Sequence, residues 1–347
     1  MRLKTAKPLA LFLLISSFSF GQGSGNISDF LLGGPEDAET MLNNYMAPAL
    51  KGWGMGYNNG WYNTAKPHES LGFDLTVTTN FAYVPTEQQV FGFVPQDYNF
   101  TRLSSGSDQN LPTVAGGPTT SELIVAYDTL GQTIELARYG AIDGVGDELP
   151  AFKNTVPSVV LQAGLGIVKG TELKVRWMPE INQDDLSLKY FGFGVMHSIS
   201  QWIPVFKDLP IDISGFVGYT NIEAVYNIPE NTVGDGFTGD NMRAEFKINT
   251  FSYQALASVK VSVLTAYIGL GMDSYTTNIN MLGSYSYSYP LIGDVTFTDP
   301  VQLEQSGNNG FRSTFGARLK LAIITFHADY TFREYNTLSM GVGFSFR

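Results

Sequence analysis

The 347-residue chain contains no cysteine, only three histidines and few charged residues. Without cysteine the protein has neither disulfides nor thiolate metal sites. A lipid-anchored precursor, which needs a cysteine after its leader, is excluded for the same reason. Charged residues make up 15% of the chain, whereas a typical soluble domain has about 25%. Something other than a charged surface must therefore cover much of this protein.

Long apolar runs are missing as well once residue 20 is passed. A membrane-spanning helix needs roughly 20 predominantly apolar residues in succession. Inside a bilayer every backbone polar group must be satisfied within the protein, so only helices and closed β-barrels can span it. If the mature chain lies in a membrane, it must therefore do so as a closed barrel.

The first 21 residues have the pattern of a secretory signal peptide. A basic start precedes the apolar run PLALFLLISSFSF at 8–20, and the small residues Ser19 and Gly21 predict cleavage before Gln22. The run is too short to span a membrane as a helix. We therefore predict an exported protein with a signal peptide at residues 1–21; an uncleaved anchor is the alternative.

The mature chain is strongly acidic. Removal of residues 1–21 leaves 18 Lys and Arg against 32 Asp and Glu, which changes the net charge from −11 to −14. Binding to nucleic acid relies on basic patches that neutralise phosphates. The charge balance therefore predicts that nucleic acid is not a partner.

The pattern that dominates the mature chain is an alternation of apolar and polar residues. In GFDLTVTTNFAYVP at 72–85 and LSMGVGFSFR at 338–347, nearly every second side chain is apolar, and a strand points successive side chains to opposite faces. Such runs reach about 10 residues, as tilted transmembrane strands do, whereas soluble strands average about 5–6. The pattern predicts an all-β transmembrane antiparallel β-barrel; a secreted β-sandwich is the alternative.

We predict the barrel at residues 72–347, with about 12–14 strands. Short turns on the periplasmic side and long loops outside give the asymmetry expected of such barrels. An additional hairpin within 85–120 or 281–309 would raise the count from twelve to fourteen. The twelve predicted strands lie near 72–84, 121–128, 131–139, 157–168, 171–181, 186–196, 210–227, 243–258, 263–280, 310–320, 323–334 and 337–347.

Residues 22–71 precede the barrel and are predicted to form a short helical plug. Pro35 suits the first turn of a helix, the carboxylates that follow it suit the positive end of the helix dipole, and Gly52 is the predicted end. The plug would either line a hydrophobic solute path with its aromatic side chains or pack under the barrel as a cap. The aromatic candidates are Trp53, Tyr57, Trp61 and Tyr62.

Charged residues near the C-terminus share the face that is predicted to line the lumen. One interpretation is a constriction that favours an anionic solute or the carboxylate headgroup of a solute. The other is ordinary ion pairing across neighbouring strands. These lumen candidates are Arg312, Arg318, Lys320, His327, Asp329 and Arg333.

No catalytic residue, metal site or cofactor is predicted. A barrel hydrolase would need Ser, His and an orienting Asn or Asp on one face. His327 has an Asp on its face, but Ser313 has the parity of the outward-facing Phe311 and Phe315. The acidic stretch DGVGDE at 143–148 lacks the spacing of a twelve-residue calcium loop. We therefore predict that the protein is not an enzyme.

Several segments carry a resemblance to known membrane proteins. GMGYNNGWYNTAKPH at 54–68, which leads straight into the first strand, and YFGFGVMHSISQWIP at 190–204, together with the C-terminal hairpin, resemble an uncharacterised family of Gram-negative outer-membrane β-barrel proteins. The resemblance covers essentially the whole mature chain. The chain is more distantly similar to the long-chain fatty-acid transporter barrels, whose N-terminal segment folds into the barrel. The alternating C-terminal end with a closing aromatic resembles an outer-membrane assembly signal.

The resemblance implies a cell outer-membrane location. The implied partners are outer-membrane lipid and lipopolysaccharide, the barrel-assembly machinery and a hydrophobic small-molecule solute. Our hypothesis for the function is passive uptake of hydrophobic or amphipathic small molecules. The alternatives are a structural or surface-interaction barrel without transport and an outer-membrane lipid hydrolase.

Overall fold

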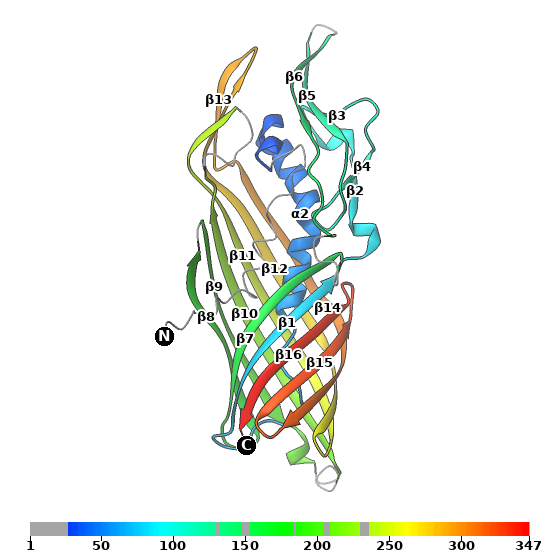
Figure 1. The fold of residues 1–347 in the computed structure, drawn as a ribbon, viewed down its shortest axis with the longest axis vertical. Coiled ribbons are helices and arrows are strands. Elements are labelled where there is room, and N and C mark those ends of the chain that lie inside the picture. The colour runs from blue at the N-terminus through cyan, green and yellow to red at the C-terminus, as the bar shows by residue number, and fades with distance from the viewer. Residues whose placement is uncertain are drawn as a thin grey trace, which may run out of the picture.

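In the part of the chain that the structure describes, ten antiparallel strands form a closed ring (Figure 1). The last strand closes the ring against the first, with Phe73 opposite Phe346. This arrangement confirms the predicted antiparallel β-barrel. The predicted signal peptide lies outside the described residues. The computed structural model describes residues 27–129, 132–147, 153–183, 185–203, 209–229 and 236–346.

The ring strands follow one another in chain order, interrupted only by elements that lie outside the ring. The ring consists of β1 (Phe73–Tyr83), β7 (Thr155–Gly166), β8 (Thr171–Gln183), β9 (Leu186–Ser198), β10 (Ile211–Asn227), β11 (Phe237–Val261), β12 (Leu264–Tyr289), β14 (Val301–Leu321), β15 (Ile324–Phe332) and β16 (Thr337–Phe346).

Apolar side chains cover the outside of the ring near the end where its turns are short. On β1, Leu75 and Val77 are exposed, whereas Thr76 and Thr78 next to them are buried inside the ring. This alternation is that of a lipid-facing belt around a polar lumen. Exposed apolar residues continue the belt around the ring: Trp177, Phe191, Phe193, Val217, Phe251, Leu270, Phe311, Phe315, Phe326 and Phe344.

A row of exposed charges marks the upper edge of this belt. Glu223 on β10 lies opposite Lys189 on β9 and Lys247 on β11, and its carboxylate oxygens are 2.9 and 3.9 Å from the two Nζ atoms. Beyond this row the strands β11, β12 and β14 continue to total lengths of 25, 26 and 21 residues. Because about 9–11 residues cross a bilayer, the barrel wall extends past the membrane at its long-loop end.

The predicted strand count of twelve to fourteen is wrong for the described residues. The sequence predicts ring strands at 121–128 and 131–139, but β5 (Glu122–Thr129) and β6 (Gln132–Gly140) form a hairpin outside the ring that pairs with β3 (Thr101–Leu103). Alternation does not reveal which apolar layer a strand faces. Here the apolar side chains pack with the outer part of the plug instead of facing lipid.

The two stretches that could have added a ring hairpin add none. Within 85–120, β2 (Val90–Gly92) and β4 (Asn110–Pro112) pair only with each other. Within 281–309, β13 (Gly293–Thr298) folds back onto the end of β12. Both pairs lie at the long-loop end, above the ring (Figure 1). Two short helical turns, η3 (Thr86–Gln88) and η4 (Pro95–Asp97), also lie within 85–120. A third, η5 (Ser200–Trp202), follows β9 at the short-turn end.

One long helix, α2 (Pro35–Tyr57), runs down the inside of the barrel and follows the short helix η2 (Ile27–Gly33) (Figure 1). It contacts β1, β7, β11, β12 and β14. Pro35 lies in its first turn, as the sequence predicts. The predicted end at Gly52 is wrong, because the helix continues to Tyr57.

Among the described residues, no helix combines the length and the apolar character that crossing a membrane requires.

The glycines in the last turns of α2 serve close packing and do not end the helix. A Cβ at Gly54 would lie 2.3 Å from the ring of Tyr275, and a Cβ at Gly56 would lie 2.5 Å from Oγ of Ser158. Gly52 is equally close to the barrel wall. Each glycine costs helix stability of about 1 kcal/mol relative to alanine, and tertiary contact with the wall outweighs that local preference.

We expect Gly54→Val to destabilise the protein, because its side chain would overlap the Tyr275 ring. Overpacking of this kind costs about 1–3 kcal/mol. Urea unfolding of the purified protein in detergent micelles measures the change. The matched control is Gly92→Val, because a Cβ at Gly92 meets nothing within 4 Å. Equal stability of the two variants would contradict the packing of α2 against β12.

Candidate functional site

Three arginines of the barrel wall surround the lower end of α2. Arg176 comes from β8, Arg312 from β14 and Arg333 from the residue after β15. Each guanidinium is buried inside the ring: Arg176 is 0% exposed, and the side chains of Arg312 and Arg333 are 2% exposed. We call these three residues the arginine collar.

The collar donates hydrogen bonds to the backbone carbonyls at the end of α2. Arg333 Nη2 donates to the carbonyl of Met55 at 2.6 Å, and Arg176 Nη1 donates to that of Tyr57 at 2.6 Å. The last carbonyls of a helix have no partner within the helix and carry the negative end of its dipole. Cationic donors therefore satisfy both the hydrogen-bonding and the electrostatic demand of this helix end.

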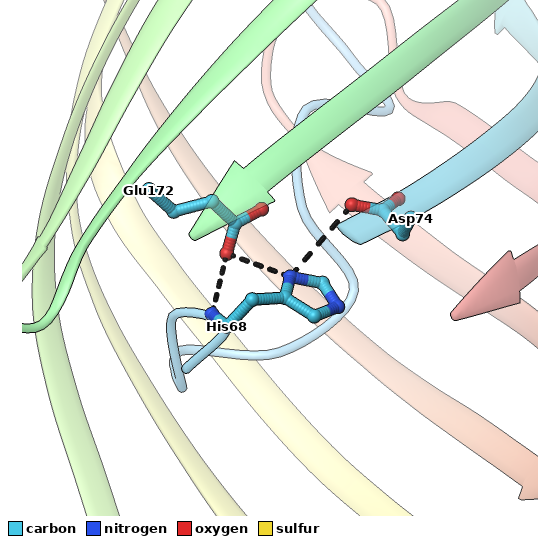
Figure 2. Close-up of side chains that lie close together, drawn as sticks. All are labelled: His68, Asp74 and Glu172. Atoms are coloured by element: carbon cyan, nitrogen blue, oxygen red, sulfur yellow. Dashed lines mark hydrogen bonds and ion pairs between the residues drawn. The ribbon is translucent and has the colours of Figure 1, made fainter. Parts of the chain in front are cut away.

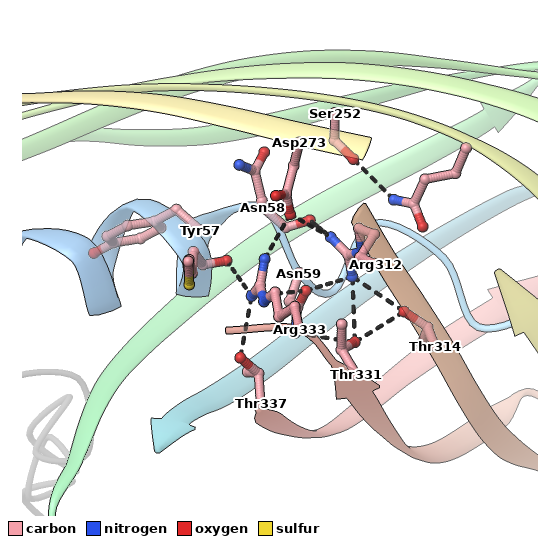
Figure 3. A network of polar contacts seen from close by, with 12 residues as sticks. Tyr57, Asn58, Asn59, Ser252, Asp273, Arg312, Thr314, Thr331, Arg333 and Thr337 are labelled. Carbon is pink, nitrogen blue, oxygen red and sulfur yellow. Dashed lines mark hydrogen bonds and ion pairs between the residues drawn. The ribbon is translucent and has the colours of Figure 1, made fainter. Parts of the chain in front are cut away.

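The collar also binds the turn that follows the helix. Arg176 Nη2 donates to the carbonyl of Asn59 at 2.6 Å, and Arg312 Nη1 donates to that of Asn58 at 2.9 Å. The Asn59 side chain accepts from both Arg312 and Arg333 (Figure 3). Five carbonyl oxygens from residues 55–59 thus face three guanidinium groups.

Asp273 on β12 supplies the negative charge of this network. Its Oδ2 lies 3.3 Å from Arg312 Nη1 and 2.5 Å from Arg333 Nη1 (Figure 3). One carboxylate for three arginines leaves the collar electropositive. Buried charges are stabilised by pairing and by hydrogen bonds, so the plug carbonyls are part of what stabilises the collar.

The four predicted plug aromatics all lie inside the barrel. Trp61 stacks on the Arg176 guanidinium, whose Cζ is 3.5 Å from the ring centroid, and the Tyr62 hydroxyl donates to Gln254 at 2.6 Å. Trp53 and Tyr57 pack against an apolar cluster on the wall. These side chains fill space between helix and wall, so in this structure they contact protein on the sides where a solute path would run.

The upper end of α2 is held by the loops at the long-loop end. Asp37 in the first turn is buried and accepts the backbone N–H groups of Asn99, Phe100 and Thr101 at 2.7, 2.9 and 2.7 Å. The hydroxyl of Tyr98, the residue before Asn99, accepts a hydrogen bond from Asn44 of the helix. Burial raises the pKa of Tyr98 to about 12. The helix is therefore fastened at both ends, by backbone donors above and by the collar below.

The six predicted lumen charges do not form a single constriction. Arg312 and Arg333 belong to the collar. Asp329 accepts a hydrogen bond from the hydroxyl of Tyr267 at 2.9 Å. These three residues therefore have protein partners inside the barrel: Arg312 and Arg333 pair with Asp273, and Asp329 accepts from a neutral hydroxyl.

The other three lumen candidates lie closer to the short-turn end. His327 Nε2 is 3.3 Å from Oγ1 of Thr78. Arg318 Nη2 and Lys320 Nζ donate to Oγ of Ser345 at 3.0 and 3.1 Å. This group is separated from the collar along the strands, since Arg318 is six residues from Arg312 on β14.

Sequence reasoning missed Arg176, Asp273 and Asn59. Arg176 lies on the polar face of TELKVRWMP, which faces the lumen. This position was the one signal in the sequence that could have identified Arg176 as a cation facing the plug. A second cluster was missed entirely: His68, Asp74 and Glu172 come together at the short-turn end.

A closed ring of ten strands, an apolar outer belt and a lumen filled by a helix define a plugged outer-membrane β-barrel protein. The chain belongs to DUF6588, a family of unknown function, whose family model matches residues 2–346. A search of curated proteins finds no match.

Several solved structures are similar to the chain at low identity. Ail, the attachment invasion locus protein of Yersinia pestis, is 8% identical, with 80% of this chain and 99% of that chain covered and a TM-score of 0.26. The translocator domain of autotransporter NalP from Neisseria meningitidis is 10% identical, with 81% of this chain and 90% of that chain covered and a TM-score of 0.28. The outer membrane protease OmpT from Escherichia coli is 8% identical, with 79% of this chain and 95% of that chain covered and a TM-score of 0.27. TM-scores this low carry no argument, so the assignment rests on the ring itself.

We expect Arg176→Gln to loosen the lower end of α2. Hydrogen bonds to charged groups contribute about 1.5–3 kcal/mol each, and every 1.4 kcal/mol is about tenfold in an equilibrium constant. Amide hydrogen exchange in the last turn of α2 should therefore accelerate about tenfold or more, with β15 and β16 unchanged. The matched control is Arg138→Gln on β6, whose ion pairs are exposed. Identical exchange in both variants would contradict the proposed role of the collar.

Proposed function

We propose that this protein takes up hydrophobic or amphipathic small molecules passively across the outer membrane, with α2 as a plug that shifts to open the route. The observation that carries the proposal is the apolar interior at the long-loop end. Interiors of membrane barrels are ordinarily polar, and a polar interior would not favour an oily solute. An apolar interior would do so by removing the solute from water.

The apolar interior is built jointly by the plug and the extended wall. Leu31 and Leu50 on the plug side are fully buried, and they belong to one cluster with Ile279 and Met281 of β12. The cluster lies above the belt, where the wall passes the membrane. Its other barrel members are Phe237, Met242, Tyr285, Val301 and Leu303.

A cavity of about 350 Å³ opens beside this cluster, between the upper ends of β10 and β11. Met242 in its lining belongs to the cluster, and Ile228 packs against it. In the proposed uptake, a solute at the long-loop end would enter here, beside Met242 and Ile228. Its lining residues are Asn227, Ile228, Gly239, Asn241, Met242 and Arg243.

Below the cluster, the collar and the plug occupy the lumen together. A solute can continue only if the end of α2 leaves the three arginines. The sequence distantly resembles the long-chain fatty-acid transporter barrels, whose N-terminal segment also folds into the barrel, and this resemblance motivates a plug that takes part in uptake. With short turns in the periplasm, passage would run from the long-loop end toward the periplasmic end.

Uptake of a hydrophobic fluorescent dye by whole cells tests this proposal. We expect a strain that lacks the gene to accumulate the dye more slowly than its parent, because the apolar entry is lost. Re-expression of the full-length protein should restore the rate. A sugar of similar mass is the matched solute control and should enter all strains equally. Equal dye uptake with and without the protein would overturn the proposal.

A structural or surface-interaction barrel is the second candidate, and one feature favours it. The tip of the β12–β13 hairpin presents Leu291 and Ile292, which are 67% and 61% exposed, beyond the membrane at the long-loop end. In this case outer-membrane lipid, lipopolysaccharide and the barrel-assembly machinery would be the partners. The arrangement does not favour the hydrolase alternative. Ser313 lies on the outward face of β14 with Phe311, whereas His327 is buried in the lumen.

A further inference from the structure

The linker between α2 and β1 brings a histidine between two carboxylates of the barrel wall. His68 lies at the short-turn end, next to Asp74 at the start of β1 and Glu172 at the start of β8 (Figure 2). His68 Nδ1 is 3.1 Å from Oε2 of Glu172 and 3.8 Å from Oδ1 of Asp74. The three ligand atoms all lie within 4.8 Å of one another.

These groups are buried, and two of them face the centre of the cluster without a hydrogen bond. The side chains of His68, Asp74 and Glu172 are 8%, 7% and 0% exposed. In the described part of the chain, neither Nδ1 of His68 nor Oδ1 of Asp74 has a hydrogen-bond partner. His68 Nδ1 contacts Glu172 only as an ion pair, and a buried polar atom without a hydrogen bond costs free energy. A ligand that binds all three atoms would remove that cost.

We propose that His68, Asp74 and Glu172 bind a divalent cation of the zinc class. One imidazole nitrogen and two carboxylate oxygens are the donors found in sites that hold such ions. Tetrahedral zinc with bonds of about 2.0–2.1 Å separates its ligand atoms by roughly 3.3 Å. The two distances at His68, 3.1 and 3.8 Å, lie on either side of this value, and binding would draw the three ligand atoms, which lie within 4.8 Å of one another, closer together.

Neighbouring groups orient each ligand toward the centre. Glu172 Oε2 accepts the backbone N–H of His68 at 3.0 Å, while Lys174 binds the other oxygen of the same carboxylate. Thr76 Oγ1 donates to Oδ2 of Asp74 at 2.8 Å. His68 Nε2 is 3.1 Å from Oγ of Ser345. Such outer contacts fix the ligands of metal sites and the tautomer of a ligating histidine.

The donor set, rather than the nearby charge, selects among cations. Lys174 contacts Glu172 directly, and Arg318 and Lys320 contact Ser345 behind the imidazole, so positive charge weakens the binding of every divalent ion here. Ca²⁺ and Mg²⁺ prefer six or more oxygen ligands, and three side chains with one nitrogen donor do not supply them. Zn²⁺ gains from the imidazole nitrogen and is preferred. The alternative occupant is a proton on Nδ1 that points to the two carboxylates.

The cation would tie three separate parts of the barrel together. His68 belongs to the linker of the plug, whereas Asp74 and Glu172 belong to strands that both neighbour β7. A bound ion would therefore fix the linker to the wall at the end opposite the Asp37 contacts. This role does not depend on what the barrel transports.

Metal binding by the full-length mature protein in detergent micelles tests the proposal. After removal of metals with EDTA and dialysis against Zn²⁺, we expect about one Zn²⁺ per chain by elemental mass spectrometry. His68→Gln and Asp74→Asn should reduce binding at least tenfold. X-ray absorption of the loaded wild-type protein should show one imidazole and two carboxylate ligands, a readout that requires no variant to fold.

The matched control is His197→Gln, because His197 lies at the same end of the barrel but contacts Thr171 and Trp202. This variant should retain wild-type stoichiometry. Heat-modified gel mobility verifies that each variant keeps a folded barrel. Wild-type protein without Zn²⁺, undiminished binding in His68→Gln, or loss of binding in His197→Gln would each overturn the proposal; absence of metal would leave the proton as the occupant.

Discussion

The carbonyl oxygens at the lower end of α2 must find donors inside a barrel, and the arrangement of the lumen depends on how they do so. A helix that ends in solvent has water for this purpose, but this end is surrounded by the wall. Arg176, Arg312 and Arg333 supply charged donors. Because Asp273 alone pairs with two of them, plug and collar need each other: the helix end lacks donors without the arginines, and the arginines lack acceptors without the helix.

This mutual dependence divides the interior into two parts with different chemistry. Above the collar, apolar side chains of the plug and the extended strands pack together. Around and below it, buried Thr, Asn, Arg and carboxylate side chains form hydrogen-bonded networks beside a smaller apolar cluster that contains Trp61, Phe216 and Leu256. In the proposed uptake, a solute drawn into the upper part by the hydrophobic effect would meet a polar barrier next. The energy needed to separate the collar from α2 would then set how readily the barrel opens.

The barrel could be predicted from the sequence because the alternation of residues such as Leu75 and Val77 is local. The number of ring strands could not, because β5 and β6 alternate in the same way over a different apolar layer. Pro35 marked the start of the helix correctly.

The end of α2 was predicted wrongly because Gly52 serves close packing and does not end the helix. A Cβ at Gly52 would meet the side chain of Val156, a residue about 100 positions further along the chain, and local sequence does not show this contact. The same limit applies to the sites. Parity placed Arg312 and Arg333 in the lumen, but besides Asp273 and Asn59 their partners include backbone carbonyls, which leave no mark on a sequence pattern. Asp74 and Glu172 come close because their strands flank β7, and the linker folds back to bring His68 to them; no spacing along the chain reveals this arrangement.

A disulfide between plug and wall tests the central claim most directly. A Cβ at Gly56 would lie 3.3 Å from Cβ of Ser158, and the two Cβ atoms of a disulfide are about 3.5–4.5 Å apart. The chain has no cysteine that could interfere. With α2 held inside the ring, Gly56→Cys with Ser158→Cys should form a disulfide in the periplasm, whereas Gly56→Cys with the lipid-facing Leu161→Cys should not. Free thiols in the first pair, in a folded barrel, would show that the helix does not end at the collar.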